Sequence, residues 1–370
     1  MSNLESLYQE HGQSPWLDNL RRDWIRNGEL ARWVARGVRG VTSNPSIFEK
    51  AIGGSDDYDE QFSALVADGR EVVDAYWDLV TTDIEEALEI LRPVYDASDG
   101  EDGQVSVEVA PSLAHDTAGT LAAAEELHQR IGEPNLYVKI PGTAAGLAAI
   151  RDAVTAGINV NVTLLFSLER YDAVIEAYLT GLERRQGPVN HVTSVASFFV
   201  SRVDVEVDKR LEAIGTDAAL ALKGKAAVAN AQLAYELFTQ RFSGPRWEAL
   251  AARGARVQRP LWASTSTKDP SYPDTLYVDS LVAPDTVNTM PEKTLDAFDD
   301  HGTLARTADA DFDAAREVLA RLAEVGVDLN DVTAQLEVEG VASFTSSFDS
   351  LIETLTAKAA GPAQPSGGKA

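Results

Sequence analysis

The sequence contains no cysteine, which excludes disulfides, thiolate zinc sites and cysteine nucleophiles together. Neither GxGxxG nor GxxxxGK occurs, so the common glycine-rich phosphate loops are absent. The histidines form no HxH or HExxH pair, and we predict no metal site. No apolar run approaches about eighteen residues, and the first residues lack the apolar core of a signal peptide. These absences favour a cytoplasmic protein.

Positive charge is also scarce. The 370 residues include 32 Lys and Arg against 58 Asp and Glu, a formal net charge of −26. Nucleic acids and anionic membranes are bound by basic surfaces, so we expect neither as a partner. Apolar residues make up 44% of the chain and charged residues 24%, which is ordinary for a globular protein with a sizeable core.

The chain alternates between strand-like and helix-like stretches. Strand character is found at 14–20, 38–46, 104–112, 135–143, 158–166, 191–202, 259–270 and 285–291. Helical patterns occupy 56–94, 117–131, 144–156, 167–182, 203–254 and 310–359. Such alternation predicts a closed (β/α)₈ TIM barrel with additional helices, spanning residues 1–360, and a flexible tail at 361–370. A doubly wound open sheet is the alternative, but it usually begins with a glycine-rich turn.

The most informative stretch is NLYVKIPGT, residues 135–143, which has a lysine inside a short apolar run. At the two-residue period of a strand, aliphatic residues occupy one face, and Tyr137 and Lys139 occupy the other. Lysine is rarely buried without a reason. Desolvation favours the neutral amine, which can attack a carbonyl and form a Schiff base. The alternatives are a strand-end lysine paired with a carboxylate and one that extends past the sheet edge into water.

Neighbouring strands place further polar residues on the same parity as Lys139 or near their own carboxyl ends. These residues are Glu108, Asn161, Thr163, Asp18, Asn44 and Ser197. In a barrel the polar parity faces inward, and active sites lie at the carboxyl ends of the strands. Each Asp or Asn alone is more often a cap or a turn residue, so only the joint placement indicates a site.

Six motifs resemble those of the transaldolase family and occur in the family's order. They are GVTSNPSIF (40–48), VSVEVAPSLAHD (105–116), NLYVKIPGT (135–143), GINVNVTLLFS (157–167), VASFFVSR (195–202) and WASTSTKDP (262–270). The resemblance covers the chain from Asp18 to about Pro291. It implies a class I aldolase that uses a lysine Schiff base and needs no metal or organic cofactor.

The resemblance also implies a role for each matching residue. Lys139 would form the Schiff base, Asp18 would act as the general base, and Glu108 with Thr163 would hold a catalytic water. The enzyme would transfer a dihydroxyacetone unit from sedoheptulose 7-phosphate or fructose 6-phosphate to glyceraldehyde 3-phosphate or erythrose 4-phosphate, in the pentose phosphate pathway. Its partners would be sugar phosphates, and it would be a monomer or homodimer.

Substrate binding is implied for a second set of residues. The set comprises Asn44, Asn161, Ser197, Phe199, Arg202, Ser264 and Lys268. Arg202 and Ser264 match the phosphate-binding pair, because a guanidinium offers phosphate a fork of donors. In the family an arginine closely follows that serine, whereas here Lys268 is the next cation. Lys268 either takes that role or is a solvated loop lysine.

Three other functions stay open at this point. A fructose 6-phosphate aldolase would use the same chemistry but release dihydroxyacetone to water, and the length of the chain favours transfer over this. A sugar-phosphate-binding barrel without turnover would have no need of the complete set of Lys139, Glu108, Asp18 and Asn161. A fusion with a sugar isomerase domain would need a longer chain.

Overall fold

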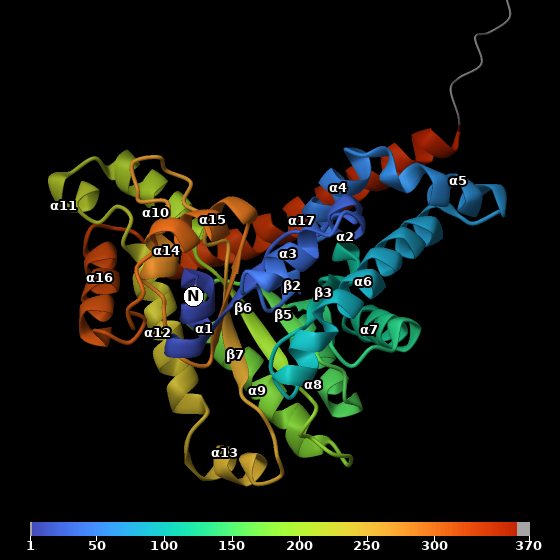
Figure 1. Cartoon of the computed structure of the whole chain (residues 1–370). Coiled ribbons are helices and arrows are strands. Elements are labelled where there is room, and N and C mark those ends of the chain that lie inside the picture. The colour runs from blue at the N-terminus through green and yellow to red at the C-terminus, as the bar shows by residue number, and fades with distance from the viewer. Residues whose placement is uncertain (1, 361–370) are drawn as a thin grey trace, which may run out of the picture.

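The computed structural model describes residues 2–360, and the predicted tail at 361–370 lies outside this range. Eight parallel strands pair in chain order and close into a barrel, which confirms the predicted fold class (Figure 1). The strands are β1 (Gln13–Leu17), β2 (Val41–Thr42), β3 (Val105–Glu108), β4 (Leu136–Pro141), β5 (Val160–Leu165), β6 (Ser194–Phe199), β7 (Gln258–Ala263) and β8 (Thr286–Met290).

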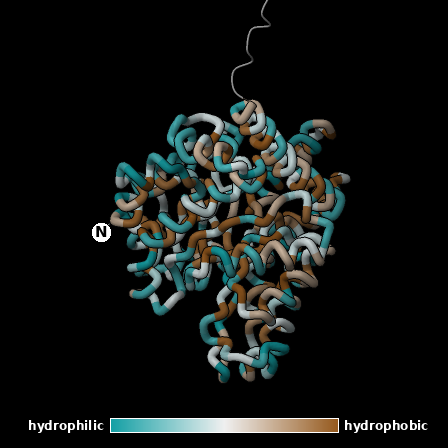
Figure 2. Tube along the Cα trace, turned by 90° about the vertical axis from the view of Figure 1, so that its right-hand side faces the viewer, coloured by the Kyte–Doolittle hydropathy of each residue, from teal (hydrophilic) through white to brown (hydrophobic). Residues whose placement is uncertain are grey.

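Helices connect the strands and surround the barrel (Figure 1). They are α1 (Asn3–His11), α2 (Arg22–Arg26), α3 (Glu29–Ala35), α4 (Pro45–Gly53), α5 (Asp59–Ala67), α6 (Val72–Ala97), α7 (Thr117–Ile131), α8 (Gly146–Ala156), α9 (Leu168–Arg184), α10 (Ser201–Ile214), α11 (Asp217–Leu220), α12 (Ala226–Arg241), α13 (Gly244–Ala251), α14 (Leu276–Asp279), α15 (Glu292–His301), α16 (Phe312–Glu324) and α17 (Leu329–Ala359). Two short 3₁₀ helices, η1 (Asp56–Tyr58) and η2 (Pro111–Leu113), precede α5 and α7. Figure 2 shows apolar residues gathered in the interior and hydrophilic residues on the outer helices.

Local capping explains several helix ends that the sequence predicted. The α9 helix begins after Ser167, whose hydroxyl accepts a hydrogen bond from the Arg170 amide. The α7 helix begins after Asp116 in the same way and ends at Gly132, which has a φ of 69°. The predicted helix at 56–94 is instead divided into η1, α5 and α6, and the chain turns between α5 and α6 at Gly69, which has a φ of 84°.

The predicted alternation fails near the end of β5. Leu164 has a φ of 60°, and the pairing of β5 with β6 shifts register between Val162 and Leu165. A strict two-residue alternation through 158–166 would put Leu164 on the same face as Val160 and Val162, and this bulge removes it from that face. Its side chain lies against Gly340 of α17, where a Cβ would come within 2.9 Å of the Leu164 Cδ2. Glycine at this position therefore lets α17 approach the barrel closely.

The long helix α17 crosses the carboxyl-terminal mouth of the barrel (Figure 1). It contacts α10 on one side, the end of β5 in the middle, and α4 and α6 on the other side. The Ser347 hydroxyl shares a hydrogen bond of 2.7 Å with the Ser46 hydroxyl of α4. The mouth of the barrel is therefore partly roofed by a helix from the far end of the chain.

The opposite, amino-terminal end of the barrel is held by a buried carboxylate. Asp102 accepts hydrogen bonds from Ser14, Trp16, Arg39 and Arg259, with distances between 2.7 and 3.1 Å. These partners come from β1, from the approach to β2, and from β7. Burial alone would raise the pKa of Asp102, but Arg259 and Arg39 outweigh burial and lower it. The Asp102 carboxylate thus links the first strand of the barrel to the seventh, across the β1–β8 pairing that closes the barrel.

We predict that Asp102→Asn lowers the free energy of unfolding by about 3–5 kcal/mol, because it leaves Arg259 buried without a counter-ion. A carboxyl whose folded pKa is depressed stabilises the fold above its unfolded pKa, so the difference should shrink as the pH falls below about 4. Urea unfolding of the wild type and of Asp102→Asn, above and below this pH, measures the difference in their free energies of unfolding. The control is Asp99→Asn, at a side chain that is 99% exposed, which should change stability by less than about 0.5 kcal/mol.

Candidate active site

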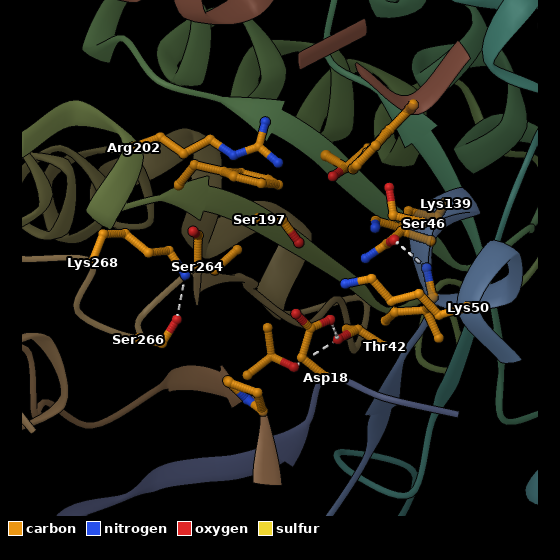
Figure 3. Close-up of a pocket in the computed structure, with 18 residues that line it drawn as sticks. Asp18, Thr42, Ser46, Lys50, Lys139, Ser197, Arg202, Ser264, Ser266 and Lys268 are labelled. Carbon is orange, nitrogen blue, oxygen red and sulfur yellow. Dashed lines mark hydrogen bonds between the residues drawn. The ribbon is translucent and has the colours of Figure 1, made fainter. Parts of the chain in front are cut away.

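A cavity of about 310 Å³ opens at the carboxyl-terminal end of the barrel, beneath α17 (Figure 3). The predicted site residues that line it are Asp18, Asn44, Lys139, Thr163, Ser197, Phe199, Arg202, Ser264 and Lys268. The other two, Glu108 and Asn161, lie in the wall behind it and contact residues of the lining. The structure therefore brings all eleven residues that the sequence singled out to one place.

Lys139 lies at the base of this cavity with its amine almost entirely removed from bulk water. Its side chain is 5% exposed, and its Nζ lies 3.1 Å from Glu108 Oε2. The Nζ donates a hydrogen bond of 3.0 Å to the Ser43 carbonyl. Glu108 and Lys139 are direct partners in the register of β3 and β4, which explains why the two side chains meet. One alternative for Lys139 was a strand-end lysine paired with a carboxylate, and Glu108 is such a partner. Lys139 nevertheless also lines the cavity.

Both carboxylates of the site are held in an environment that disfavours their charge. Burial raises the pKa of Glu108 and outweighs the opposing effect of Lys139. Burial likewise raises the pKa of Asp18, although Lys139 and a hydrogen bond of 2.7 Å from the Thr42 hydroxyl favour its ionised form. A carboxylate that is costly to ionise is well suited to taking up a proton.

Asn161 is fixed by hydrogen bonds on both sides of its amide. Its Nδ2 donates to the Ser106 hydroxyl at 3.0 Å, and its Oδ1 accepts from the Ser197 hydroxyl at 2.7 Å. Thr163 differs, because its hydroxyl is buried and has no hydrogen-bond partner within residues 2–360. The Glu108 oxygens also accept no geometrically ideal hydrogen bond within that range, although Oε2 forms the ion pair with Lys139, so Oε1 has no partner there at all. A buried polar group normally has a partner, so these atoms are suited to a water or a ligand.

Asn44 has two uses in the same place. Its side-chain oxygen caps α4 by accepting a hydrogen bond of 3.0 Å from the Ile47 amide. Asn44 also lines the cavity, and the NH₂ of an Asn side chain can donate to a substrate hydroxyl. The capping bond uses the side-chain oxygen and so fixes the rotamer of this residue. The Asn-Pro pair thus starts a helix and supplies a polar contact at once.

Cations and hydroxyls gather on the side of the cavity formed by β6, β7 and the loops after them. The Arg202 guanidinium lies 5.2 Å from the Phe199 ring and 5.9 Å from the Phe344 ring, which orient it. Lys268 Nζ donates to the Ser266 hydroxyl at 2.6 Å. Ser264 has a φ of 56°, an uncommon backbone conformation, and its hydroxyl shares a hydrogen bond of 2.8 Å with the Ser201 hydroxyl.

Several lining residues were not anticipated from the sequence. They are Thr42, Ser46, Ile47, Lys50, Ala263, Ser266, Thr289, Pro291 and Phe344. Lys50 is four residues after Ser46 and three after Ile47, so the three are neighbours on the surface of α4. Phe344 belongs to α17, and no local pattern places that helix over the barrel. Its ring lies 5.6 Å from Lys139 Nζ and closes the cavity from above.

No helix within residues 2–360 combines the length and the apolar content needed to cross a bilayer. No group of three or more His, Asp or Glu side chains there is arranged to bind a metal ion.

The barrel, the buried lysine–carboxylate pair and the cationic end of the cavity are the features expected of an aldolase that forms a Schiff base. The sequence model of the family described as Transaldolase/Fructose-6-phosphate aldolase matches residues 15–355, and the chain belongs to this family. A transaldolase of Parafrankia sp. is 54% identical over 360 residues, which are 96% of this chain and 98% of the relative. Transaldolase 1 of Streptomyces avermitilis is 53% identical over 96% of this chain and 95% of its own. A transaldolase of Thermobifida fusca is 52% identical over 95% of this chain and 97% of its own.

The raised pKa of Asp18 predicts the effect of Asp18→Asn on stability. A carboxyl whose folded pKa is raised stabilises the fold below its unfolded pKa, and that contribution is lost as the pH rises through the folded value. The neutral amide should therefore increase the melting temperature near pH 7.5. This increase should disappear below about pH 4, where the carboxyl of the unfolded chain is also protonated.

Thermal unfolding at both pH values is the measurement. Asp23→Asn, at a carboxylate that forms an exposed ion pair with Arg21, is the matched control and should change the melting temperature little at either pH. A lower melting temperature for Asp18→Asn at pH 7.5 would contradict the electrostatic description of the site.

Proposed function

We propose that this chain is a transaldolase that moves a dihydroxyacetone unit from a ketose phosphate to an aldose phosphate through a Schiff base on Lys139. The observation that carries the proposal is the position of the Lys139 amine. It is 3.1 Å from a buried carboxylate and at the base of a cavity with cations at its other end. The family and the names of the relatives support the same activity.

The first step joins substrate and enzyme. The Lys139 amine adds to the C2 carbonyl of the ketose, and loss of water from the resulting carbinolamine gives the iminium. Glu108 is the residue best placed to take the ammonium proton, because it is the direct partner of Lys139. A water held between Glu108 and the Thr163 hydroxyl, which has no hydrogen-bond partner among residues 2–360, would carry protons to and from the carbinolamine oxygen.

The second step breaks the C3–C4 bond of the bound sugar. Asp18 takes the proton of the C4 hydroxyl, the bond electrons move to C3, and the iminium nitrogen accepts them to give an enamine. The C4 carbon leaves as the aldehyde of a shorter aldose phosphate. We assign the hydroxyls of the retained three-carbon unit to Asn44, Asn161 and Ser197, which line or support this part of the cavity.

The third step reverses these events with a new partner. The enamine carbon attacks the aldehyde carbon of the acceptor, and Asp18 returns its proton to the new hydroxyl. Hydrolysis of the iminium then releases the product ketose phosphate, which is longer than the acceptor by the transferred dihydroxyacetone unit, and restores the amine. We assign the phosphate of both donor and acceptor to Arg202, Ser264 and Lys268, with Phe199 holding the guanidinium in place.

The physiological setting stays a prediction. We propose fructose 6-phosphate and sedoheptulose 7-phosphate as donors, glyceraldehyde 3-phosphate and erythrose 4-phosphate as acceptors, and the pentose phosphate pathway in the cytoplasm. We also propose one barrel domain over residues 1–360, a monomer or homodimer, and no nucleic acid or membrane partner, in keeping with the net charge of −26.

An acceptor-dependence assay tests the activity and separates it from the aldolase alternative. With fructose 6-phosphate and erythrose 4-phosphate, we expect glyceraldehyde 3-phosphate to form with repeated turnover. Without an acceptor, the enamine should persist, and glyceraldehyde 3-phosphate should stop at about one equivalent per enzyme. Continuous release of dihydroxyacetone in the absence of acceptor would instead indicate an aldolase.

In the same assay, Lys139→Arg should lower kcat by at least about 10⁴-fold, since a guanidinium remains charged and cannot act as the nucleophile. Lys225→Met is the control, because Lys225 is exposed and lies outside the cavity lining. It should retain full activity.

A further inference from the structure

Lys50 lines the active-site cavity but has no part in the chemistry described above. It belongs to α4, in which Ser46, Ile47 and Lys50 all line the cavity. Lys50 is four residues after Ser46 and three after Ile47, and residues with this spacing are neighbours on a helix surface. The three side chains therefore face the barrel mouth together. Figure 3 shows the Lys50 side chain extending into the cavity from the side opposite Arg202 and Lys268.

The Lys50 amine is available to a ligand. The side chain is exposed, and the ion pairs and side-chain hydrogen bonds found within residues 2–360 do not include its Nζ. Lys209, Lys223 and Lys358, by contrast, each pair with a carboxylate. The helix that carries Lys50 is itself held in place, because Ser46 is hydrogen-bonded to α17.

The cavity lining is positive although the protein is strongly acidic. Apart from Lys139, the charged side chains that line the cavity are three cations, Arg202, Lys268 and Lys50, and one carboxylate, Asp18. The three cations line one cavity of about 310 Å³. Burial lowers the pKa of Lys268, Arg202 lowers it further, Asp18 opposes this, and Lys50 makes a smaller contribution in the same direction as Arg202. A phosphate monoester carries about −1.5 to −2 charges near neutral pH, which is close to the excess of positive charge here.

We propose that Lys50 is a third phosphate-binding cation, which acts together with Arg202 and Lys268 on the phosphate of the donor and acceptor sugars. This inference rests on the proposed function. The two proposed donors differ by one carbon between the reacting centre and the phosphate, so their phosphates lie at different distances from Lys139. Arg202 is confined by two phenylalanine rings, whereas a lysine on a flexible four-carbon stem can follow the phosphate.

Lys50→Met tests the proposal, because methionine keeps the length of the side chain and removes its charge. We expect the KM values for fructose 6-phosphate and erythrose 4-phosphate to rise about tenfold, the usual effect of losing one charge-assisted hydrogen bond. The kcat should stay within about twofold. With unphosphorylated erythrose as acceptor, kcat/KM for the acceptor should not change. Lys50→Arg should restore most of the affinity for the phosphorylated sugars.

Lys209→Met is the matched control, since it removes one positive charge from an exposed position on α10 that does not line the cavity. It should leave every KM unchanged. Titration calorimetry with inorganic phosphate gives a reading without turnover, and Lys50→Met should weaken phosphate binding by a similar factor.

Unchanged KM values and phosphate affinity in Lys50→Met would overturn the proposal, and so would equal losses with phosphorylated and unphosphorylated acceptors. A wild-type protein that binds phosphate through Lys50 but shows no transfer would contradict the proposed function and leave the role of Lys50 standing.

Discussion

The contact between Lys139 and Glu108 is the interaction on which the rest of the site depends. It exists because β3 and β4 pair in parallel with these two residues opposite each other, both on the parity that faces into the barrel. Burying an amine and a carboxylate together is costly, and the compensation here is incomplete, since Glu108 Oε1 has no partner within residues 2–360. A fold selected only for stability would gain from an apolar pair at this position. Retaining the charged pair is consistent with a catalytic use.

The barrel makes this cost tolerable by stabilising the two ends differently. At the amino-terminal end, Asp102 is fully paired with Arg39 and Arg259 and joins strands that are distant in sequence. At the carboxyl-terminal end, Asp18 and Glu108 have raised pKa values because burial outweighs their partners. The α17 helix roofs this second end and contributes Phe344, which limits water near the amine. Stability and chemistry are therefore located at opposite ends of the same strands.

Much of this arrangement could be predicted from the sequence, because it depends on short-range patterns. The two-residue alternation located the strands, and the shared parity of Glu108, Lys139 and Asn161 placed them on the inner face. What depends on long-range packing could not be predicted. The register shift near Leu164 occurs where the strand meets α17, and Phe344 reaches the cavity only because that helix returns across the barrel. Lys50 was missed because a charged residue on a short helix looks like any solvated lysine. The roles assigned to individual site residues remain predictions.

The central claim is that Lys139 becomes covalently bound to the substrate, and trapping with borohydride tests it most directly. Sodium borohydride reduces an iminium to a stable secondary amine, so incubation with fructose 6-phosphate and reductant should leave a three-carbon, dihydroxyacetone-derived adduct. Peptide mass spectrometry should locate the adduct on Lys139 and find none without the sugar. An adduct on Lys268 or Lys50 instead, or no adduct from an enzyme that still catalyses transfer, would contradict the mechanism.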